Sequence, residues 1–346
     1  MKAYLLKNIG EFEYREVKEP VCGENEVIVK VMAAGICGSD IPRIYTTGAY
    51  SYPLIPGHEF SGIVSEAGQK VDKKWLGKRV GVFPLIPCGK CRSCKTGRYE
   101  LCRNYGYLGS RSHGGFAEYV KVPSWNLLEL PLNVSFEQAA MLEPMAVAVH
   151  AMRRSGILKG DSVAICGLGT IGLLLYMFLA DIGIEHIYLI GNKEYQKEIC
   201  MHLGINERNF CNSSIEDVHN WLDGICNSGV DVFFDCAGGA KSVGTALRNT
   251  VPNGKVVLVG NPASDMTFDQ QTYWKILRNQ LTVMGTWNSS FTHKADDDWH
   301  YCLDFITNGK HPERLISHKL AFDKLKTGTK LMRDKTEPYT KVMVLL

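Results

Sequence analysis

The sequence predicts an α/β protein in which a β-rich domain is interrupted by a doubly wound, parallel-sheet domain. Between residues 161 and 260, short apolar segments alternate with helical segments, which is typical of a parallel sheet covered on both faces. The flanking regions alternate apolar with polar residues and are rich in glycine and proline, which indicates antiparallel strands and turns. We therefore expect residues 1–150 and 286–346 to form the β-rich domain and residues 151–285 the parallel-sheet domain.

The first 131 residues are expected to contain strands, turns and few helices. "EFEYREV" (11–17) and "NEVIVKV" (25–31) alternate as half-buried strands do, and "YPLIPGHEFSG" (52–62) shows the turn residues. Alanine, methionine and leucine then dominate residues 135–156, which predicts helix. Ser135 with Gln138 three residues later predicts a capping box at its start.

The parallel-sheet domain follows as alternating strands and helices. The expected strands are "SVAIC" (162–166), "HIYLIG" (186–191), "DVFFD" (231–235) and "GKVVLVG" (254–260). The expected helices are "IGLLLYMFLADIG" (171–183), "EYQKEICMHLG" (194–204) and "KSVGTALRNTV" (241–251). The final "YTKVMVLL" (339–346) returns to strand character.

Composition narrows the class of protein. A chain of 346 residues, 45% hydrophobic and 22% charged, is typical of a globular protein of two domains. A net charge of +3 is too small to indicate nucleic acid or a membrane surface as partner. The amino terminus shows no signal peptide, and the longest apolar stretch, residues 173–180, is shorter than the roughly 18 residues of a membrane span. We expect a cytoplasmic protein.

Four of the twelve cysteines, Cys88, Cys91, Cys94 and Cys102, form the pattern C-x2-C-x2-C-x7-C. Four thiolates in one short segment can close a tetrahedral zinc shell that leaves no open position, which is a structural site. An iron–sulfur cluster is the alternative, but its usual C-x2-C-x2-C-x3-C-P spacing differs. Disulfides are a third reading, disfavoured because the other eight cysteines are dispersed as in a reducing compartment.

"GICGSD" (35–40) and "GHEFSG" (57–62) supply Cys37, His58 and Glu59. One thiolate and one imidazole are half of a catalytic zinc site, in which three protein ligands leave one position open. Taken alone, a cysteine such as Cys37 is more often a small buried hydrophobe, and a histidine such as His58 is more often a hydrogen-bonded loop residue.

A glycine-rich run, "GLGTIG", lies between an expected strand and an expected helix, and that context predicts a dinucleotide site. Gly167 permits a tight turn, Gly169 lets the backbone approach a pyrophosphate, and Gly172 allows close helix–strand packing. The phosphates are expected on the amides of Thr170, Ile171 and their neighbours at the helix amino terminus.

The next strand ends without the acidic residue that normally binds the ribose 2′-hydroxyl of NAD. Gly191, Asn192 and Lys193 stand there instead. Glycine removes the repulsion toward a 2′-phosphate, asparagine can donate hydrogen bonds, and lysine offers a cation. We therefore expect NADP to be preferred over NAD. The alternative is that Lys193 is a solvated charge at a helix start and that NAD binds less tightly.

Six segments occur in an order that resembles the zinc-dependent medium-chain alcohol and polyol dehydrogenases, over essentially the whole chain. They are "GICGSD" (35–40), "PGHEFSG" (56–62), the four-cysteine segment, "GGFAEYV" (114–120), "EPMAVAVHA" (143–151) and "GLGTIG" (167–172). The resemblance implies a GroES-like catalytic domain, a Rossmann nucleotide domain and a homodimer or homotetramer. Residues 37–62, 107–119 and 275–290 are most similar to family members that act on galactitol 1-phosphate, and the sorbitol dehydrogenases come next.

The resemblance also implies a catalytic zinc held by Cys37, His58 and Glu143, in addition to the structural zinc, so two zinc ions per chain. Glu59 is expected to be an exchanging or neighbouring ligand. Zinc there acts as a Lewis acid on the substrate hydroxyl. Ser39 occupies the family's proton-relay position, although it could instead cap the following helix.

The implied reaction transfers hydride between NADP(H) and a polyol phosphate/ketose phosphate pair. Arg43, Arg111 and His113 lie in motifs expected to border the cleft and could bind the phosphate, or each could serve a structural ion pair. Because the acidic residue expected after the second strand is missing, the identity of the sugar substrate is also undecided. A pentitol phosphate, free sorbitol, free xylitol and another secondary alcohol are the alternatives.

Two other classes of protein are weighed. A zinc-free quinone-type reductase on the same fold would lack the set Cys37, His58 and Glu143. A non-catalytic zinc- and dinucleotide-binding sensor would bind zinc without turning over any polyol, so zinc analysis with a turnover assay separates it from a dehydrogenase.

Overall fold

The computed structural model describes residues 1–227 and 229–346. The chain forms two compact units: the first comprises Met1–Ala146 and Ser289–Leu346, and the second comprises Val147–Asn288. The first unit is β-rich and the second has a parallel sheet, so the predicted fold class is confirmed. Among the described residues, no helix combines the length and the apolar character that a membrane span requires.

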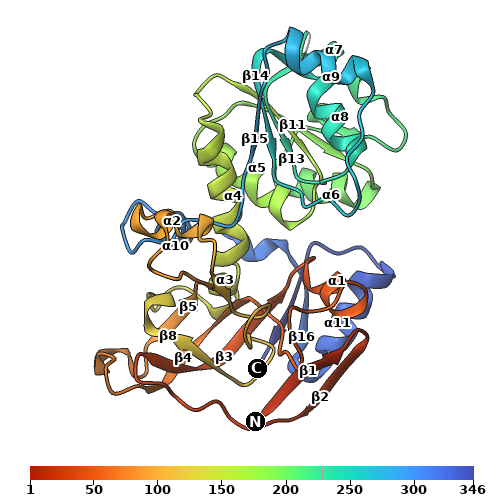
Figure 1. Cartoon of the computed structure of the whole chain (residues 1–346). Helices are drawn as coiled ribbons and strands as arrows, with labels where there is room; N and C mark the ends of the chain where they lie inside the picture. The colour runs from red at the N-terminus through yellow and green to blue at the C-terminus, as the bar shows by residue number, and fades with distance from the viewer. Residues whose placement is uncertain (228) are drawn as a thin grey trace. The chain divides into compact units, whose positions relative to one another are not determined.

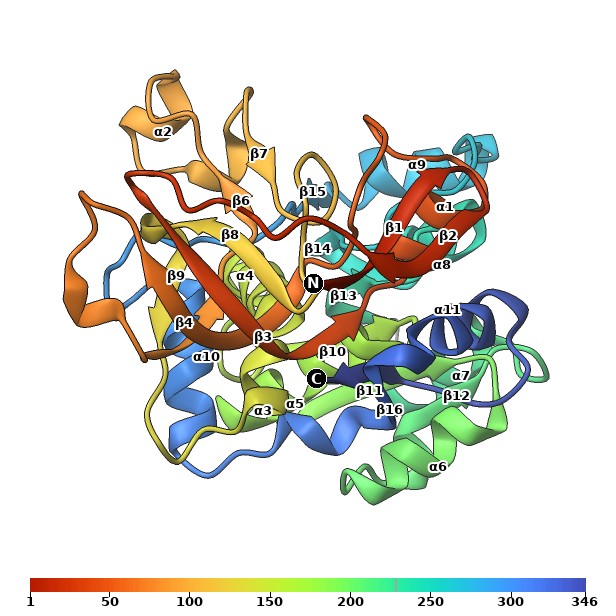
Figure 2. The ribbon, with the colours of Figure 1, turned by 90° about the horizontal axis from the view of Figure 1, so that it is seen from below.

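The main sheet of the first unit is built around one long strand, β3, which pairs with β4, β8 and β17 in antiparallel fashion. Figure 2 shows β4 and β8 beside it. In sheet order, the strands are β16 (Ile316–Ala321), β17 (Lys341–Leu345), β3 (Glu26–Ile36), β4 (Glu59–Ala67), β5 (Arg79–Val82) and β9 (Leu127–Glu129), with β8 (Tyr119–Pro123) on β3. The smaller pairs are β1 (Lys2–Asn8) with β2 (Glu11–Glu16), and β6 (Leu85–Ile86) with β7 (Gly106–Tyr107).

The helices of the first unit are short and lie between these strands. They are α1 (Asp40–Tyr45), α2 (Arg92–Lys95), α3 (Phe136–Ala140), α10 (Asp298–Thr307) and α11 (Leu325–Asp334), and α4 (Leu142–Ser155) continues into the second unit. The predicted capping box is confirmed at α3: Ser135 Oγ accepts from the Gln138 amide at 3.1 Å, and Gln138 Oε1 accepts from the Ser135 amide at 2.9 Å.

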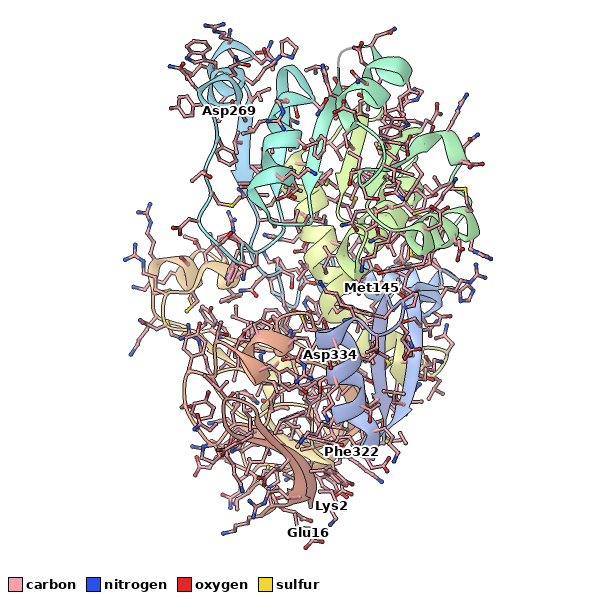
Figure 3. The ribbon with its side chains drawn as sticks, turned by 90° about the vertical axis from the view of Figure 1, so that its right-hand side faces the viewer. Lys2, Glu16, Met145, Asp269, Phe322 and Asp334 are labelled. Atoms are coloured by element: carbon pink, nitrogen blue, oxygen red, sulfur yellow. The ribbon has the colours of Figure 1, made fainter. Side chains whose placement is uncertain are left out.

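The hairpin of β1 and β2 shows why the alternating pattern forms strands. Lys2 lies opposite Glu16 and forms an ion pair of 3.1 Å, and both are labelled in Figure 3. Further along the same face, Phe12 is fully buried and its ring centroid lies 5.1 Å from that of Tyr4. Phe322 meets Tyr4 edge to face, so the hairpin contributes to the core of the first unit.

The second unit contains, among its described residues, a six-stranded sheet in which every pair is parallel. The order is β12 (Phe210–Asn212), β11 (His186–Gly191), β10 (Ser162–Cys166), β13 (Val230–Asp235), β14 (Thr250–Leu258) and β15 (Thr282–Gly285). The chain builds outward from β10 in one direction and from β13 in the other. The order therefore reverses between β10 and β13, and ligands of such sheets bind at the carboxyl ends of the strands near this reversal.

The helices of the second unit connect the strands. They are α5 (Thr170–Asp181), α6 (Glu194–His202), α7 (Val218–Cys226), α8 (Ala240–Arg248) and α9 (Gln270–Arg278), and α8 contacts both α7 and α9 (Figure 1). The helix expected over 241–251 ends earlier, because β14 already begins at Thr250. Apolar side chains of the central strands and of α5 form the core of this unit. Among them, Val163, Ile165 and Phe178 are fully buried.

Candidate active site and cofactor site

The four-cysteine segment places four sulfurs around one point. Sγ of Cys91 lies 3.5 Å from that of Cys94 and 3.9 Å from that of Cys102, and Cys88 lies 4.0 Å from Cys94. A tetrahedral zinc with Zn–S bonds of about 2.3 Å separates its sulfurs by roughly 3.8 Å. All twelve cysteines are free thiols. The donor set and its spacing therefore fit zinc, and these sulfur separations are longer than the about 2.05 Å of a disulfide bond.

The backbone around these cysteines favours a thiolate. The amides of Cys94 and Arg103 lower the pKa of Cys91 to about 6. Burial raises the pKa of Cys94 to about 12, so the thiols of Cys91 and Cys94 favour different protonation states as long as no cation shares their charge. A metal ion resolves this conflict, because it binds all four sulfurs as thiolates.

A second cluster forms where the end of β3 pairs with the start of β4. Cys37 follows β3, and His58 and Glu59 stand at the start of β4, which pairs Gly35 with Glu59. One ligand atom from each of Cys37, His58 and Glu59 lies within 4.8 Å of the others. The strand pairing thus joins two motifs that are separate in the sequence.

Asp40, at the start of α1, orients this cluster from behind. Its Oδ2 accepts from the Cys37 amide at 3.1 Å, and its Oδ1 accepts from Arg43 at 2.6 Å and lies 3.6 Å from His58 Nδ1. Nδ1 of His58 is buried and has no hydrogen-bond partner, and it faces Asp40, which leaves Nε2 as the nitrogen for a metal. Burial opposes a charge on His58, but Asp40 and Cys37 raise the pKa of His58 well above its usual value.

Glu143 reaches the same region from the first turn of α4. It is buried, and Tyr107 Oη donates to its Oε1 at 3.1 Å. Burial raises the pKa of Glu143 to about 7, and His58 and Glu59 are its charged neighbours. The ring of Tyr107 also lies 5.8 Å from that of His58, edge to face. Glu143 does not belong to the group formed by Cys37, His58 and Glu59, in which all ligand atoms lie within 4.8 Å of one another.

Glu59 is held by a buried ion pair. Its Oε2 lies 2.5 Å from Lys341 Nζ, and the two residues are 1% and 3% exposed, so water does not screen the pair. Lys341 comes from β17 and also donates to the Ile36 carbonyl at 3.3 Å.

The charges around the cluster suit a divalent cation. Four groups are negative when ionised and two are positive, and His58, whose pKa is raised, would lose its proton on binding a metal. The negative groups are Cys37, Asp40, Glu59 and Glu143, and the positive groups are Arg43 and Lys341. The donor set of sulfur, imidazole and carboxylate is that of catalytic zinc sites.

Ser39 lies at the edge of this cluster. Its hydroxyl is 3.4 Å from Cys37 Sγ. It occupies the N-cap position of α1 but forms no side-chain capping hydrogen bond. The geometry therefore gives no support to the capping alternative.

The three residues predicted to bind a phosphate have partners within the first unit. Arg43 pairs with Asp40. The guanidinium of Arg111 lies between the rings of Tyr50 and Tyr105, 4.5 Å and 4.4 Å from their centroids. His113 and Arg111 line one hollow of about 500 Å³, which Arg43 does not border. The structure thus brings two of the three together.

Three residues of the site were not predicted. Asp40 could have been found, because it follows Cys37 by three residues in "GICGSD". Tyr107 and Lys341 carry no local signal, because β7 is only two residues long and β17 lies far along the chain from the cluster.

The glycine-rich turn has the geometry that a dinucleotide requires. Gly167 has φ of +97°, and a Cβ there would lie 2.7 Å from the Ala237 amide nitrogen. A Cβ on Gly172 would lie 2.2 Å from the Gly167 carbonyl oxygen. A Cβ on Gly169 would meet nothing within 4 Å, so this glycine borders open space. Thr170 begins α5 directly after it, so the amino-terminal end of the helix, whose dipole attracts anions, lies at this turn.

Gly191 ends β11, and Lys193 is the N-cap residue of α6. Asn192 is exposed, and Lys193 Nζ lies 5.5 Å from the ring centroid of Tyr195. The amide and the hydroxyl of Ser213 both donate to the Gly191 carbonyl at 2.8 Å, so the segment after β12 lies against this turn.

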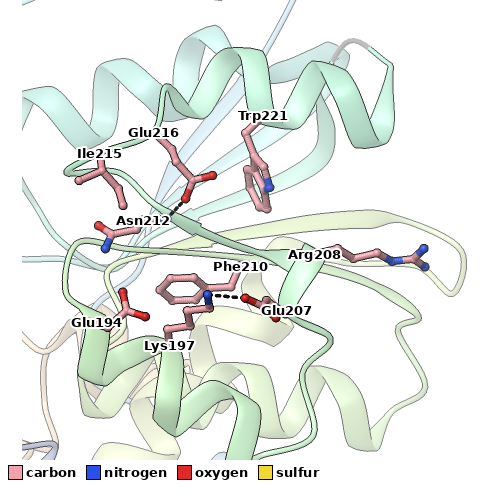
Figure 4. A pocket seen from close by; sticks show the side chains of 9 residues that line it. All are labelled: Glu194, Lys197, Glu207, Arg208, Phe210, Asn212, Ile215, Glu216 and Trp221. Atoms are coloured by element: carbon pink, nitrogen blue, oxygen red, sulfur yellow. Dashed lines mark hydrogen bonds and ion pairs between the residues drawn. The ribbon is translucent and has the colours of Figure 1, made fainter.

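A cavity of about 220 Å³ lies beside β12, between residues of α6 and α7 (Figure 4). Three of its charged groups have partners within the lining: Lys197 pairs with Glu207 at 2.5 Å, and Glu216 accepts from the Asn212 amide at 2.9 Å. Asn212 is the sheet neighbour of Gly191, so the cavity adjoins the turn at Gly191.

The chain belongs to the zinc-binding alcohol dehydrogenase family. Residues 23–132 match the Alcohol dehydrogenase GroES-like domain, and residues 170–308 match Zinc-binding dehydrogenase. The protein is therefore an oxidoreductase with the medium-chain dehydrogenase fold, which confirms the predicted resemblance.

Individual relatives match over nearly the whole chain. Galactitol 1-phosphate 5-dehydrogenase of Escherichia coli K12 is 33% identical over 320 residues, 92% of this chain and 91% of the relative. L-idonate 5-dehydrogenase of Vitis vinifera is 34% identical over 331 residues, 93% of this chain and 88% of the relative.

Solved structures agree. Galactitol-1-phosphate dehydrogenase from Escherichia coli has a TM-score of 0.92 at 30% identity, with both chains fully covered. A zinc-binding dehydrogenase from Sinorhizobium meliloti 1021, bound to NADP, has a TM-score of 0.89 at 31% identity, covering 100% of this chain and 99% of that one.

Proposed function

We propose that this dehydrogenase transfers hydride between NADP(H) and a polyol phosphate/ketose phosphate pair. The observation that carries the proposal is the cluster of Cys37, His58 and Glu59, whose ligand atoms lie within 4.8 Å of one another and in which His58 and Glu59 are buried. The named relatives and the turn at Gly191 supply the finer choices of substrate and cofactor.

Cys37, His58 and Glu143 are proposed as the ligands of a catalytic zinc. Glu59 is the less suitable carboxylate, because its Oε2 is bound to the charged Lys341 at 2.5 Å, whereas Glu143 accepts a hydrogen bond from the neutral phenol of Tyr107. When bound, zinc supplies Lewis acidity to the substrate oxygen. Ser39 is proposed to pass the hydroxyl proton toward solvent, because its own hydroxyl is exposed and borders Cys37.

NADP is proposed as the preferred cofactor. Gly191 carries no carboxylate to repel a 2′-phosphate, Asn192 is exposed beside it, and Lys193 supplies a cation. The solved Sinorhizobium meliloti relative is bound to NADP, which supports the same choice.

A phosphorylated polyol is proposed as substrate because of the galactitol 1-phosphate relative and the basic hollow of Arg111 and His113. Free polyols or other secondary alcohols are the second candidate. That candidate is favoured by the partners that Arg43 and Arg111 already have, and by the equally similar L-idonate relative.

We also propose a homodimer formed by the second unit. β15 is an edge strand, and its Val283 is 39% exposed. Nearby on α9, Tyr273 and Leu277 are 54% and 58% exposed. An unpaired edge with apolar side chains is a template for pairing with a second copy of the same strand. The free thiols further support a reducing compartment, for which we propose the cytoplasm.

Consumption of NADPH and NADH with matched ketoses and ketose phosphates, pentulose and hexulose members included, tests the proposal. NADPH turnover restricted to phosphorylated ketoses is the expected result. A preference for NADH would overturn the proposed cofactor. Equal rates on free sugars and sugar phosphates would overturn the proposal that the substrate is phosphorylated. Zinc in the protein without turnover on any member of the panel would instead support the sensor.

A further inference from the structure

Gly191 faces a side chain that leaves no room for a larger residue. A Cβ placed on Gly191 would lie 2.8 Å from Gln196 Oε1 and 3.1 Å from the ring of Phe210. Gln196 is 8% exposed, so its amide fills the space beside Gly191 from the first turns of α6. In a chain that binds NAD, this is the end of the strand where the acidic side chain stands.

The amide of Gln196 is fixed at both of its ends. Its Oε1 accepts from the Asn192 amide at 2.9 Å, and its Nε2 donates to the Leu168 carbonyl at 3.1 Å. Leu168 belongs to the glycine-rich turn after β10, and Asn192 belongs to the turn after β11. One side chain therefore connects the segment expected to hold the pyrophosphate with the segment expected to hold the ribose.

We propose that Gln196 is a positioning residue for the dinucleotide, and that cofactor choice depends on the pair Gly191 and Gln196 rather than on Gly191 alone. This inference rests on the proposed function, in that it assumes a dinucleotide at these two turns. The amide of Gln196 aligns the turns and occupies the volume that a carboxylate at position 191 needs.

The proposal has a consequence for changing the cofactor. An aspartate introduced at position 191 must push Gln196 away from Leu168 and Asn192, which leaves a backbone carbonyl and a backbone amide without their partner. Gly191→Asp alone is therefore expected to weaken the binding of both NADP and NAD. Removing the Gln196 side chain at the same time makes space for the carboxylate.

The first test needs no cofactor. We expect Gly191→Ala to lower the Tm by roughly 2–4 °C when Gln196 is present, and to have a clearly smaller effect in the Gln196→Ala background. Gly224→Ala in α7 is the control, because a Cβ there meets nothing within 4 Å; its effect should be equal in both backgrounds. Equal effects of Gly191→Ala in the two backgrounds would overturn the steric part of the proposal.

The second test measures Kd for NADP and NAD by calorimetry in the wild type, Gly191→Asp, Gln196→Ala and the double variant. Gly191→Asp should weaken both cofactors by about tenfold, and the double variant should recover NAD binding, but not NADP binding, by about fivefold or more over that single variant. Effects on NAD that simply multiply would overturn the coupling.

The wild-type measurements separate this inference from the proposed function. A wild type that binds NAD more tightly than NADP overturns the proposed cofactor, while the Tm coupling between positions 191 and 196 still stands or falls by itself. A wild type that prefers NADP without any coupling leaves the proposed function intact and removes the role given to Gln196.

Discussion

Tyr107 donates a hydrogen bond of 3.1 Å to Glu143, so a strand of two residues fixes the carboxylate that α4 brings to the candidate metal site. The sequence gives no hint of this contact, because the two residues are separated by 36 positions. The phenol restrains Glu143 without adding a charge. Its removal therefore tests the role of Glu143 without deleting a proposed ligand.

We expect Tyr107→Phe to keep its zinc content and to lose about tenfold in kcat/KM, because a hydrogen bond to a charged group contributes about 1.5 kcal/mol. Steady-state kinetics and metal analysis by mass spectrometry measure the two quantities. Tyr105→Phe is the matched control, because it also removes a tyrosine hydroxyl but keeps the ring that contacts Arg111. Unchanged kinetics in Tyr107→Phe would contradict the role assigned to the contact.

Replacement of one sulfur should empty the four-cysteine segment. We expect Cys94→Ser to lower the zinc content from two ions per chain to one and to lower the Tm, because a structural zinc contributes directly to folding. Cys22→Ala removes a thiol outside both clusters and should keep both ions. Iron in place of zinc in the wild type would revive the cluster alternative.

Lys193 is the cation proposed to contact the 2′-phosphate. Lys193→Ala should raise the KM for NADP by about tenfold and leave the KM for NAD nearly unchanged, since only NADP carries the phosphate. Lys197→Ala removes a nearby lysine that is already paired with Glu207 and should change neither value. A KM for NADP that stays constant in Lys193→Ala would show that this lysine is a solvated charge.

Arg111 separates the two substrate candidates. Arg111→Ala should lower kcat/KM for phosphorylated substrates about tenfold more than for free polyols, if the guanidinium binds the phosphate. Tyr50→Leu removes one of the rings that hold Arg111 and keeps the charge, so it should have the smaller effect of the two. Equal losses on both classes of substrate would assign Arg111 to structure alone.

The edge strand β15 can be tested by a single charge. Val283→Lys should convert the proposed homodimer into a monomer in light-scattering chromatography, because a lysine on an edge strand opposes pairing with a second strand. Ile182→Lys adds the same charge at a similarly exposed apolar position after α5. A wild type that is already monomeric would refute the dimer.

Much of the fold could be predicted because it is written in local patterns. Buried apolar strands, the glycine-rich turn and the capping box each depend on residues within one short segment. β12 and β15 were missed, because strands of three and four residues are too short to show a period, and β15 is exposed. The shortened α8 reflects competition at Thr250, whose β-branched side chain favours the following strand.

The candidate site divides in the same way. Its cysteines and glycines could be identified from spacing, whereas Glu59 meets Lys341 across 282 positions of sequence. A contact of that range depends on sheet register, in which β17 lies against β3, and no local pattern encodes it. The same holds for Gln196, which reads as one more polar residue of an amphipathic helix until the turn at Leu168 is placed beside it.

The position of β17 has a consequence for the order in which the protein is made. The second unit, residues 147–288, is synthesised between the two segments that build the first unit. During translation, β3 and β4 are therefore made before β17, their partner in the sheet. Glu59 has no Lys341 to pair with until the second unit has been synthesised and β17 follows. The surroundings of the candidate metal site are therefore incomplete until Lys341 is made, and a nascent chain arrested before residue 341 would lack the cation that pairs with Glu59.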